Sequence, residues 1–203
     1  MFVGIDLGAS AIHAVAVEAS LELIGAIVFA PESINDLIDL VRGAECIAID
    51  APSSLSTGPH LEDLSLSPKF RSARCAEIAL GREHRIWVPW VTPQAAEDAA
   101  AWMMLGFRLY EELGEQGHRL IEVYPHAGFR VLADGRVPKK TTPAGILARA
   151  GLLREAGIQP PGLEAWSHDA LDAAVAALTA RRAHGGTARS VGCGHDGSAI
   201  WLP

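Results

Sequence analysis

The sequence has no apolar run of about 18 residues, so it predicts no membrane-spanning helix. Its first residues, MFVGIDLGAS, carry Asp6 and lack a basic start, and they predict a strand and not a secretion signal. The net charge of −7 leaves too few basic groups for a protein that coats nucleic acid non-specifically. A nuclease remains possible, because bound metal ions supply local positive charge. We therefore expect a cytoplasmic protein without membrane association.

Cysteine is also scarce. The three cysteines, Cys46, Cys75 and Cys193, are odd in number and show no CxxC spacing. The spacing of nearby histidines completes no zinc pattern with them; these histidines are His84, His118 and His126. We therefore expect reduced thiols.

The 203 residues are 49% hydrophobic, enough for one packed domain over residues 1–203. Residues 2–7, 12–17 and 21–29 have the composition of three strands joined by short turns. A helix over 31–42 then leads to a strand over 46–50. A strand–helix–strand connection normally joins parallel strands, so the fourth strand should lie beside the first.

A fifth strand is expected over 120–124, which gives an α/β fold with a mixed sheet of order 3-2-1-4-5 and helices on both faces. Residues 53–118 begin irregularly and predict a helical and looped insertion over the carboxyl edge of that sheet. The remaining expected elements are helices over 70–80, 94–113, 142–156 and 167–184 and a hairpin over 191–203.

Asp6 and Asp50 each stand near the end of a strand, two positions after the small residues Gly4 and Ala48. Parallel neighbours would place both carboxylates side by side at the carboxyl edge, where ligands gather in α/β sheets. Each aspartate alone could simply cap a turn, but the matching pattern favours a pair. Paired carboxylates repel one another unless they are protonated or neutralised by a divalent cation.

Three further acidic residues are candidates. Glu122 lies inside an apolar strand, where it needs a partner if buried, although an exposed edge strand would also accommodate it. Asp169 and Asp172 share one helix face, and Asp169 alone is explained by its place in the first helical turn. Asp172 is therefore the preferred metal ligand. His168 is a candidate to orient water or phosphate, or is an exposed residue beside the helix cap.

The basic candidates are Arg71, Arg74, Lys139 and Lys140. The two arginines, three positions apart, could grip a phosphate together, whereas most surface arginines do not. Trp87 and Trp90 could stack a base, or more simply close the core over the insertion.

Seven segments, spread over nearly the whole chain, resemble the DUF429 family. In chain order they are GIDLGAS, IAIDAPSSL, R-x-x-R-C-A-E, IEVYPHAGF, KKTTPAG, HDALDAAVAAL and GSAIWLP. The resemblance implies a ribonuclease-H-like fold and a relationship to predicted nucleases. The chain departs from the family pattern at Ala76 and His126, where acidic residues are often found. The site that the resemblance implies comprises Asp6, Asp50, Glu122, Asp169 and Asp172, flanked by Arg71, Arg74 and Lys140.

These observations predict a metal-dependent nuclease or phosphodiesterase that acts on nucleic acid or another phosphodiester. Asp6, Asp50 and Asp172 would hold Mg²⁺ or Mn²⁺, with Glu122 at the margin. One alternative is nucleotide or phosphate binding of the actin and sugar-kinase kind, through the small residues after Asp6, although those proteins normally need two such domains. Another is a non-catalytic interaction module of the same fold.

Overall fold

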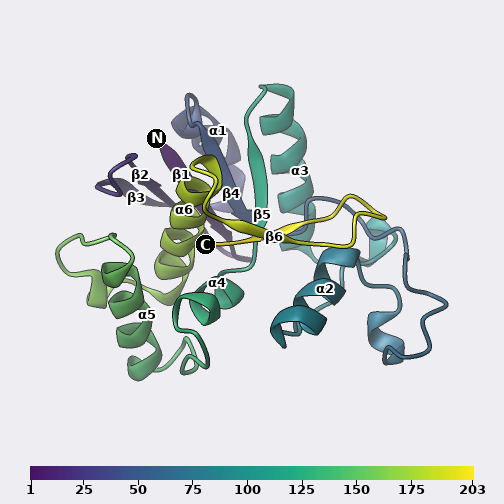
Figure 1. Cartoon of the computed structure of the whole chain (residues 1–203). Coiled ribbons are helices and arrows are strands. Elements are labelled where there is room, and N and C mark those ends of the chain that lie inside the picture. Colours follow the sequence, from purple (N-terminus) through teal and green to yellow (C-terminus); the bar gives the residue numbers. More distant parts are fainter.

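The computed structural model describes residues 1–203 and shows a seven-stranded mixed sheet with helices on both faces (Figure 1). The strand order is β3-β2-β1-β4-β5-β7-β6. Strands β1 and β2 are antiparallel, as are β2 and β3, whereas β4 runs parallel to β1 and β5 runs parallel to β4. The strands are β1 (Phe2–Leu7), β2 (Ile12–Val17), β3 (Leu23–Phe29), β4 (Cys46–Asp50), β5 (Leu120–Val123), β6 (Arg189–Val191) and β7 (Ile200–Leu202).

The expected order 3-2-1-4-5 is present, but the sheet does not end at β5. Strand β7 pairs parallel to β5, with Glu122 opposite Ile200, and β6 forms the outer edge beyond β7. The prediction of a sheet limited to five strands is therefore wrong. The hairpin joins the sheet because Ile200 and Leu202 are buried and extend its apolar surface.

One face of the sheet is covered by α6 (His168–His184) and by α4 (Pro125–Leu132), and α5 (Pro143–Glu155) packs on the outer side of these two helices. The alanine-rich α6 lies directly on β1. A Cβ atom on Gly4 would lie 2.1 Å from the carbonyl oxygen of Ala173 and 2.2 Å from the amide nitrogen of Ala177. No side chain fits at Gly4, so the small residues of β1 and α6 allow the backbones to meet.

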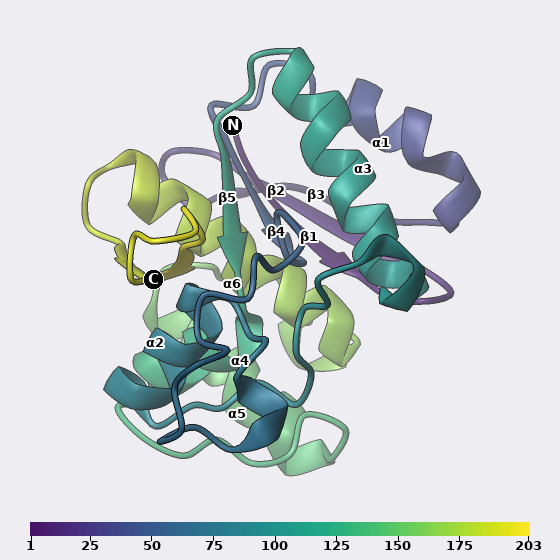
Figure 2. The same cartoon turned by 90° about the vertical axis from the view of Figure 1, so that its right-hand side faces the viewer.

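The other face is covered by α1 (Ile34–Val41) and α3 (Ala101–Glu115), which lie side by side (Figure 2). Leu109 and Leu113 of α3 join the same apolar cluster as Ile5 and Ile49. Helix α3 was expected inside an insertion over 53–118, but it forms one layer of the domain. The segment that covers the carboxyl ends of β4 and β5 lies before α3 and contains α2 (Cys75–His84) (Figure 2).

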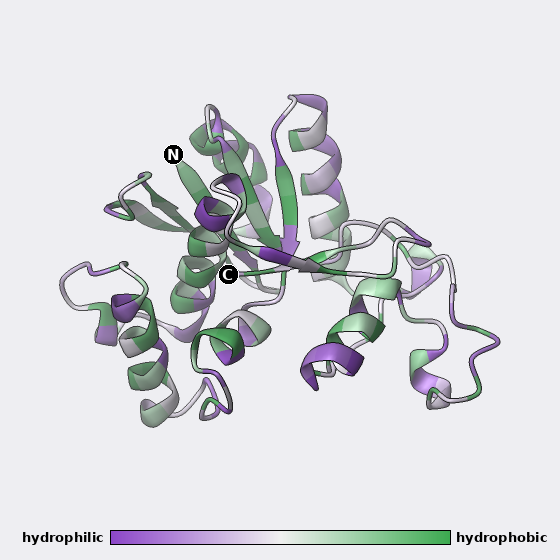
Figure 3. Cartoon of the chain, in the orientation of Figure 1, coloured by the Kyte–Doolittle hydropathy of each residue, from purple (hydrophilic) through white to green (hydrophobic).

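Hydropathy follows this layered arrangement. Figure 3 shows apolar residues along the central strands and hydrophilic residues on outer turns of the helices. The pattern matches α1, whose buried residues recur at helical spacing; they are Ile34, Leu37, Ile38 and Val41. None of the helices has the length and apolar character needed to cross a membrane.

The cysteines differ from the expectation of three reduced thiols. Cys75, at the start of α2, forms a disulfide with Cys193 in the loop between β6 and β7, while Cys46 is free and buried. The two bonded residues are 118 positions apart in the sequence. Their pairing depends on how the terminal hairpin meets α2, and residue spacing alone could not reveal it.

Candidate metal and phosphate site

Asp6 and Asp50 lie side by side at the carboxyl edge of the sheet, as the sequence predicted. They are direct partners in the parallel register of β1 and β4. Asp6 is 5% exposed and Asp50 is half-buried. The two carboxyl groups lie close enough that each shifts the pKa of the other. Two carboxyl groups can approach in this way only if they share a proton or a cation.

Asp172 reaches the same place from α6, because the close approach at Gly4 brings this helix onto β1. The Asp172 side chain is buried. Its Oδ2 accepts a hydrogen bond of 2.7 Å from Lys140 Nζ. Its Oδ1 has no hydrogen-bond partner, and Arg149 Nε lies 4.0 Å from it. A buried carboxylate oxygen without a partner is costly, and a bound cation would satisfy it.

Asp169 joins the acidic cluster together with two histidines. Ligand atoms of Asp6, His13 and Asp169 lie within 4.8 Å of one another, and so do those of His168, Asp169 and Asp172. Asp169 therefore belongs to both groups. From the sequence, Asp172 was the preferred metal ligand of these two aspartates. Sequence analysis missed His13, although the β1–β2 hairpin places it directly opposite Asp6.

The pKa values of the cluster reflect its crowding. Burial, followed by the charges of Asp172 and Asp169, raises the pKa of Asp6 to about 7. Burial and the charge of Asp6 raise the pKa of Asp50 well above its ordinary value. Burial also raises the pKa of Asp172, although Lys140 acts in the opposite direction. The cluster carries more negative potential than its own cations neutralise, and its oxygen donors suit a hard divalent cation.

Glu122 lies outside this cluster. Arg74 donates to both of its carboxylate oxygens, at 2.8 Å and 2.5 Å, and the Ser53 amide donates to Oε2 at 2.9 Å. Arg74 is only 1% exposed and also contacts Glu77 at 3.2 Å. The structure thus places Arg74 as the partner of Glu122 and not at a surface where it would meet phosphate. Arg71 also lies outside the acidic cluster, and its Nε donates to the Leu66 carbonyl.

A cavity of about 430 Å³ opens beside the acidic cluster. Asp50 and Asp172 line it together with Lys140. Sequence analysis did not identify Arg149 as a lining residue, because helical periodicity could not show which way a single arginine of α5 faces. The other lining residues are Trp87, Pro89, Trp90, Tyr124, Pro125, His126, Lys139 and Arg149.

The aromatic part of this cavity consists of Trp87, Trp90 and Tyr124. Trp87 is 44% exposed. The rings of Trp90 and Tyr124 pack edge to face with centroids 5.1 Å apart, and Trp90 also packs against Trp102 of α3. Trp90 thus packs in the core beneath the insertion and also lines the cavity, while stacking of a base on Trp87 or Trp90 stays a prediction. The cavity offers carboxylates, cations and flat apolar surfaces within one space.

Fold and site together define an α/β protein with an acidic cluster at the carboxyl edge of a mixed sheet, beside a cationic and aromatic cleft. The chain belongs to the DUF429 family, since the model of this family, described as a protein of unknown function, matches residues 4–194. The match includes every residue of the acidic cluster. No curated protein and no solved structure matches the chain.

The raised pKa of Asp6 predicts how its contribution to stability depends on pH in metal-free protein. Because the folded-state pKa is about 7 and the ordinary value is 3.8, the contribution is complete below about pH 4 and is lost as the pH rises through 7. A shift of this size corresponds to at most about 4 kcal/mol. In EDTA, the Asp6→Asn variant should therefore gain stability relative to wild type between pH 4 and pH 8, measured by urea unfolding.

Manganese provides the control for this prediction. Mn²⁺ should raise the unfolding free energy of wild type at pH 8 and leave Asp6→Asn nearly unchanged, because the ion replaces the missing proton in wild type only. A difference between the two proteins that stays constant from pH 4 to pH 8 would contradict the assignment of a raised pKa to Asp6.

Proposed function

We propose that this protein is a Mg²⁺- or Mn²⁺-dependent phosphodiesterase that acts on nucleic acid or a related nucleotide phosphodiester. The observation that carries the proposal is the convergence of Asp6, Asp50 and Asp172 on one side of a cleft that also contains cationic and aromatic groups. A purely structural role would leave the cost of this carboxylate repulsion without compensation.

Asp6, Asp50 and Asp172 are the residues that would hold the metal, with Asp169 as a further ligand. The unpartnered Oδ1 of Asp172 and the raised pKa of Asp6 both fit a cation that shares these oxygens. When bound, Mg²⁺ or Mn²⁺ supplies Lewis acidity toward a phosphate oxygen and lowers the pKa of a bound water. His13 and His168 favour Mn²⁺ over Mg²⁺, because imidazole nitrogen suits transition metals better than Mg²⁺.

Lys140 connects the acidic cluster with the cleft. Its Nζ contacts Asp172 Oδ2 at 2.7 Å and Asp169 Oδ1 at 3.5 Å, and these carboxylates raise the pKa of the lysine. Lys140 is therefore fully charged at neutral pH and is half-exposed toward the cleft. In this position it neutralises part of the cluster and can bind a substrate phosphate oxygen.

His168 can contribute to the handling of a proton. Its Nδ1 lies 2.6 Å from Asp169 Oδ1 at the start of α6. In this geometry Nδ1 makes no hydrogen bond, so a ring nitrogen of His168 is free to accept one from a water molecule. A neutral imidazole at this place is suited to position a water molecule next to the acidic cluster.

The aromatic surfaces suggest that the phosphate is attached to a nucleoside. Trp87 and Tyr124 line the same cavity as Lys139 and Lys140. Bases stack on such rings without regard to sequence, and the cations attract the backbone. The overall charge of −7 is consistent with a substrate recognised within this cleft and not over a broad surface.

Cleavage assays test the proposal directly. Purified protein is incubated with labelled single- and double-stranded DNA, RNA and a chromogenic phosphodiester, with Mn²⁺, Mg²⁺ or EDTA. We expect Mn²⁺-dependent cleavage that falls at least about 100-fold in Asp6→Asn, because removing one charged ligand weakens the bound metal. Asp36→Asn is the matched control, since Asp36 lies exposed on α1 away from the site.

Equal activity in wild type and Asp6→Asn would remove the proposal, as would an absence of cleavage of every substrate with both metals. Tight ATP binding by calorimetry without cleavage would instead favour nucleotide binding of the actin and sugar-kinase kind. A melting temperature that rises in both Asp6→Asn and Asp50→Asn while Mg²⁺ and Mn²⁺ have no effect would indicate a non-catalytic module.

A further inference from the structure

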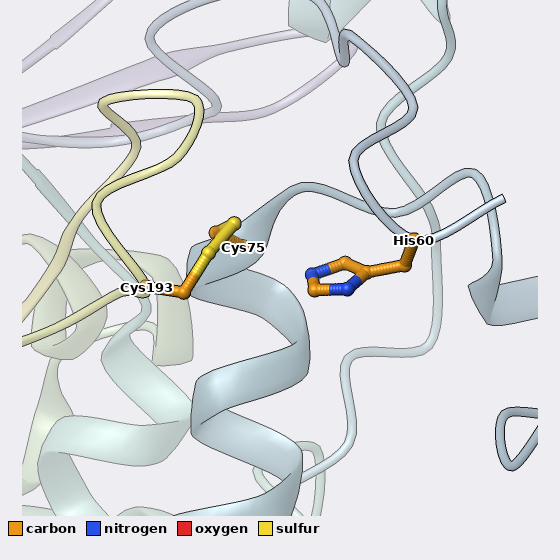
Figure 4. Close-up of side chains that lie close together, drawn as sticks. All are labelled: His60, Cys75 and Cys193. Carbon is orange, nitrogen blue, oxygen red and sulfur yellow. A yellow bond between two sulfur atoms is a disulfide. The ribbon is translucent and has the colours of Figure 1, made fainter. Parts of the chain in front are cut away.

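A second group of metal-ligand side chains lies outside the acidic cluster and consists of His60, Cys75 and Cys193. They come from three separate segments: the loop after β4, the start of α2 and the loop between β6 and β7. Their ligand atoms lie within 4.8 Å of one another. Figure 4 shows the His60 ring pointing toward the Cys75–Cys193 disulfide. The proposed phosphodiesterase site uses none of these residues.

The His60 ring has an unsatisfied nitrogen. Its Nε2 is shut off from solvent and has no hydrogen-bond partner. A buried ring nitrogen without a partner is unfavourable, and native structures seldom leave one unexplained. Two sulfur atoms beside the ring cannot satisfy it well by hydrogen bonding, because sulfur is a weak acceptor and a disulfide carries no S–H donor. A metal ion bound between the ring and the two sulfurs would satisfy it once the sulfurs are reduced to thiolates.

The two cysteines are suited to become thiolates after reduction. Cys75 is the first residue of the ten-residue helix α2, and a helix N-terminus stabilises a thiolate. Cys193 is exposed, so a reductant and an ion can reach it. Both residues are already held close, with Cα atoms 5.1 Å apart.

We propose that His60, Cys75 and Cys193 form a Cys₂His site for one Zn²⁺ ion when the disulfide is reduced. A dithiol reductant supplies two electrons and two protons to the disulfide and is itself oxidised to a disulfide. The two cysteine thiols then lose both protons to solvent as their thiolates and one His60 ring nitrogen bind Zn²⁺. Bound zinc and the disulfide are mutually exclusive states of the same residues.

The geometry suits zinc with a water molecule in the fourth position. With Zn–S bonds of about 2.3 Å and Zn–N bonds of about 2.0–2.1 Å, tetrahedral ligand atoms lie roughly 3.4–3.8 Å apart. In the structure the ligand atoms of His60, Cys75 and Cys193 lie within 4.8 Å of one another. Rotation of the side chains is enough to bring them to the spacing that zinc requires. Asp196 lies nearby, but its oxygens accept from the Cys75 and Ser198 amides, which leaves the fourth position to water.

The two states would hold the insertion differently. The disulfide joins α2 only to the β6–β7 loop, whereas zinc would also hold the loop that carries His60. Arg74, which binds Glu122 behind the acidic cluster, directly precedes Cys75. A change between disulfide and zinc-bound thiolate at Cys75 therefore takes place next to Arg74, which supports the cleft through Glu122.

Metal titration of the intact chain tests the site. The protein is reduced with a phosphine, freed of reductant without oxygen, and titrated with Co²⁺ and Zn²⁺, with an oxidised sample in parallel. We expect the reduced chain to bind one Co²⁺ more than the oxidised chain, with thiolate-to-metal charge-transfer absorption that is lost on adding Zn²⁺, and with two protons released for this additional ion. The charge-transfer band reports sulfur ligands alone, so ions in the acidic cluster do not produce it. Zn²⁺ should raise the melting temperature of the reduced protein more than that of the oxidised protein, because an ion in the acidic cluster contributes equally in both states.

Variants identify the ligands. Cys75→Ser and Cys193→Ser should abolish the charge-transfer band, and His60→Ala should weaken Zn²⁺ binding at least 10-fold. Cys46→Ala and His195→Ala are matched controls, since Cys46 is a distant core thiol and His195 is an exposed neighbour of Cys193 outside the cluster. Circular dichroism of each variant verifies its fold, and the exposed position of Cys193 makes Cys193→Ser the safest of them.

Three results would overturn the proposal. They are a reduced protein that gives no charge-transfer band, a band that survives Cys193→Ser in folded protein, and a His60→Ala variant that binds Zn²⁺ as tightly as wild type. The first would leave the pair as a structural disulfide only. Loss of binding in His195→Ala but not in His60→Ala would likewise reject His60 as the ligand.

Discussion

Substituting alanine for Gly4 should destabilise the protein by at least about 3 kcal/mol, because the new methyl group would meet backbone atoms of α6 that cannot rotate away. A Cβ at this position would lie 2.1 Å from the Ala173 oxygen and 2.2 Å from the Ala177 nitrogen. Helix α6 would have to move off β1 as a unit. Equilibrium urea unfolding of Gly4→Ala against wild type measures the change.

Gly114→Ala provides the control for the same chemical change. Gly114 lies within α3 in open space, so the added methyl group meets nothing. Alanine is favoured over glycine inside a helix by up to about 1 kcal/mol, so this variant should be as stable as wild type or more stable. Gly4→Ala should also weaken metal binding, because Asp172 depends on the same close approach. A cost below about 1 kcal/mol for Gly4→Ala would show that α6 can shift freely.

Breaking the buried ion pair of Arg74 should have a similarly large effect. Arg74→Met would leave Glu122 and Glu77 buried without their cation, and removal of one partner from a buried pair costs about 3–5 kcal/mol. The unfolding free energy measured at neutral pH should fall by this amount. Adding Glu122→Gln to Arg74→Met should recover part of the loss, because the second change removes one of the two uncompensated charges.

Arg108→Met provides the matched comparison on α3. Arg108 pairs with Glu112, but its side chain is 51% exposed, and surface ion pairs contribute about 0–1 kcal/mol. This variant should therefore remain close to wild type in unfolding free energy. Equal costs for Arg74→Met and Arg108→Met would mean that the Arg74 network is hydrated in solution, and its assigned role in supporting Glu122 would fail.

The acidic residues at the centre of the site could be predicted from the sequence, whereas most of the residues around them could not. Asp6 and Asp50 could be paired in advance because strand periodicity and a single crossover fix which residues meet at the sheet edge. Asp172 could be included because an alanine-rich helix permits close approach. These inferences depend on local pattern and on one well-founded rule of chain connection.

The surroundings depend on contacts that no local pattern encodes. Arg74 looked like a phosphate ligand by spacing, but its guanidinium reaches Glu122 on another element. Lining of the cleft by Arg149 and the role of Cys193 depend on how α5 and the final hairpin are placed in space. The position of β7 beside β5 was missed because three-residue strands carry too little periodicity to indicate a partner.

The docking of α6 on β1 also has a consequence for the order in which the protein folds. Asp6 and Asp172 come from distant parts of the chain, so most of the intervening residues must be in place before their carboxylates become neighbours. Contacts of such long sequence separation form slowly, because closing a large loop costs entropy before the contact stabilises it. The first three strands and α1 can assemble from local contacts alone. Partly folded chains therefore lack the acidic cluster, and a divalent ion meets its complete set of ligands only after the helix has docked.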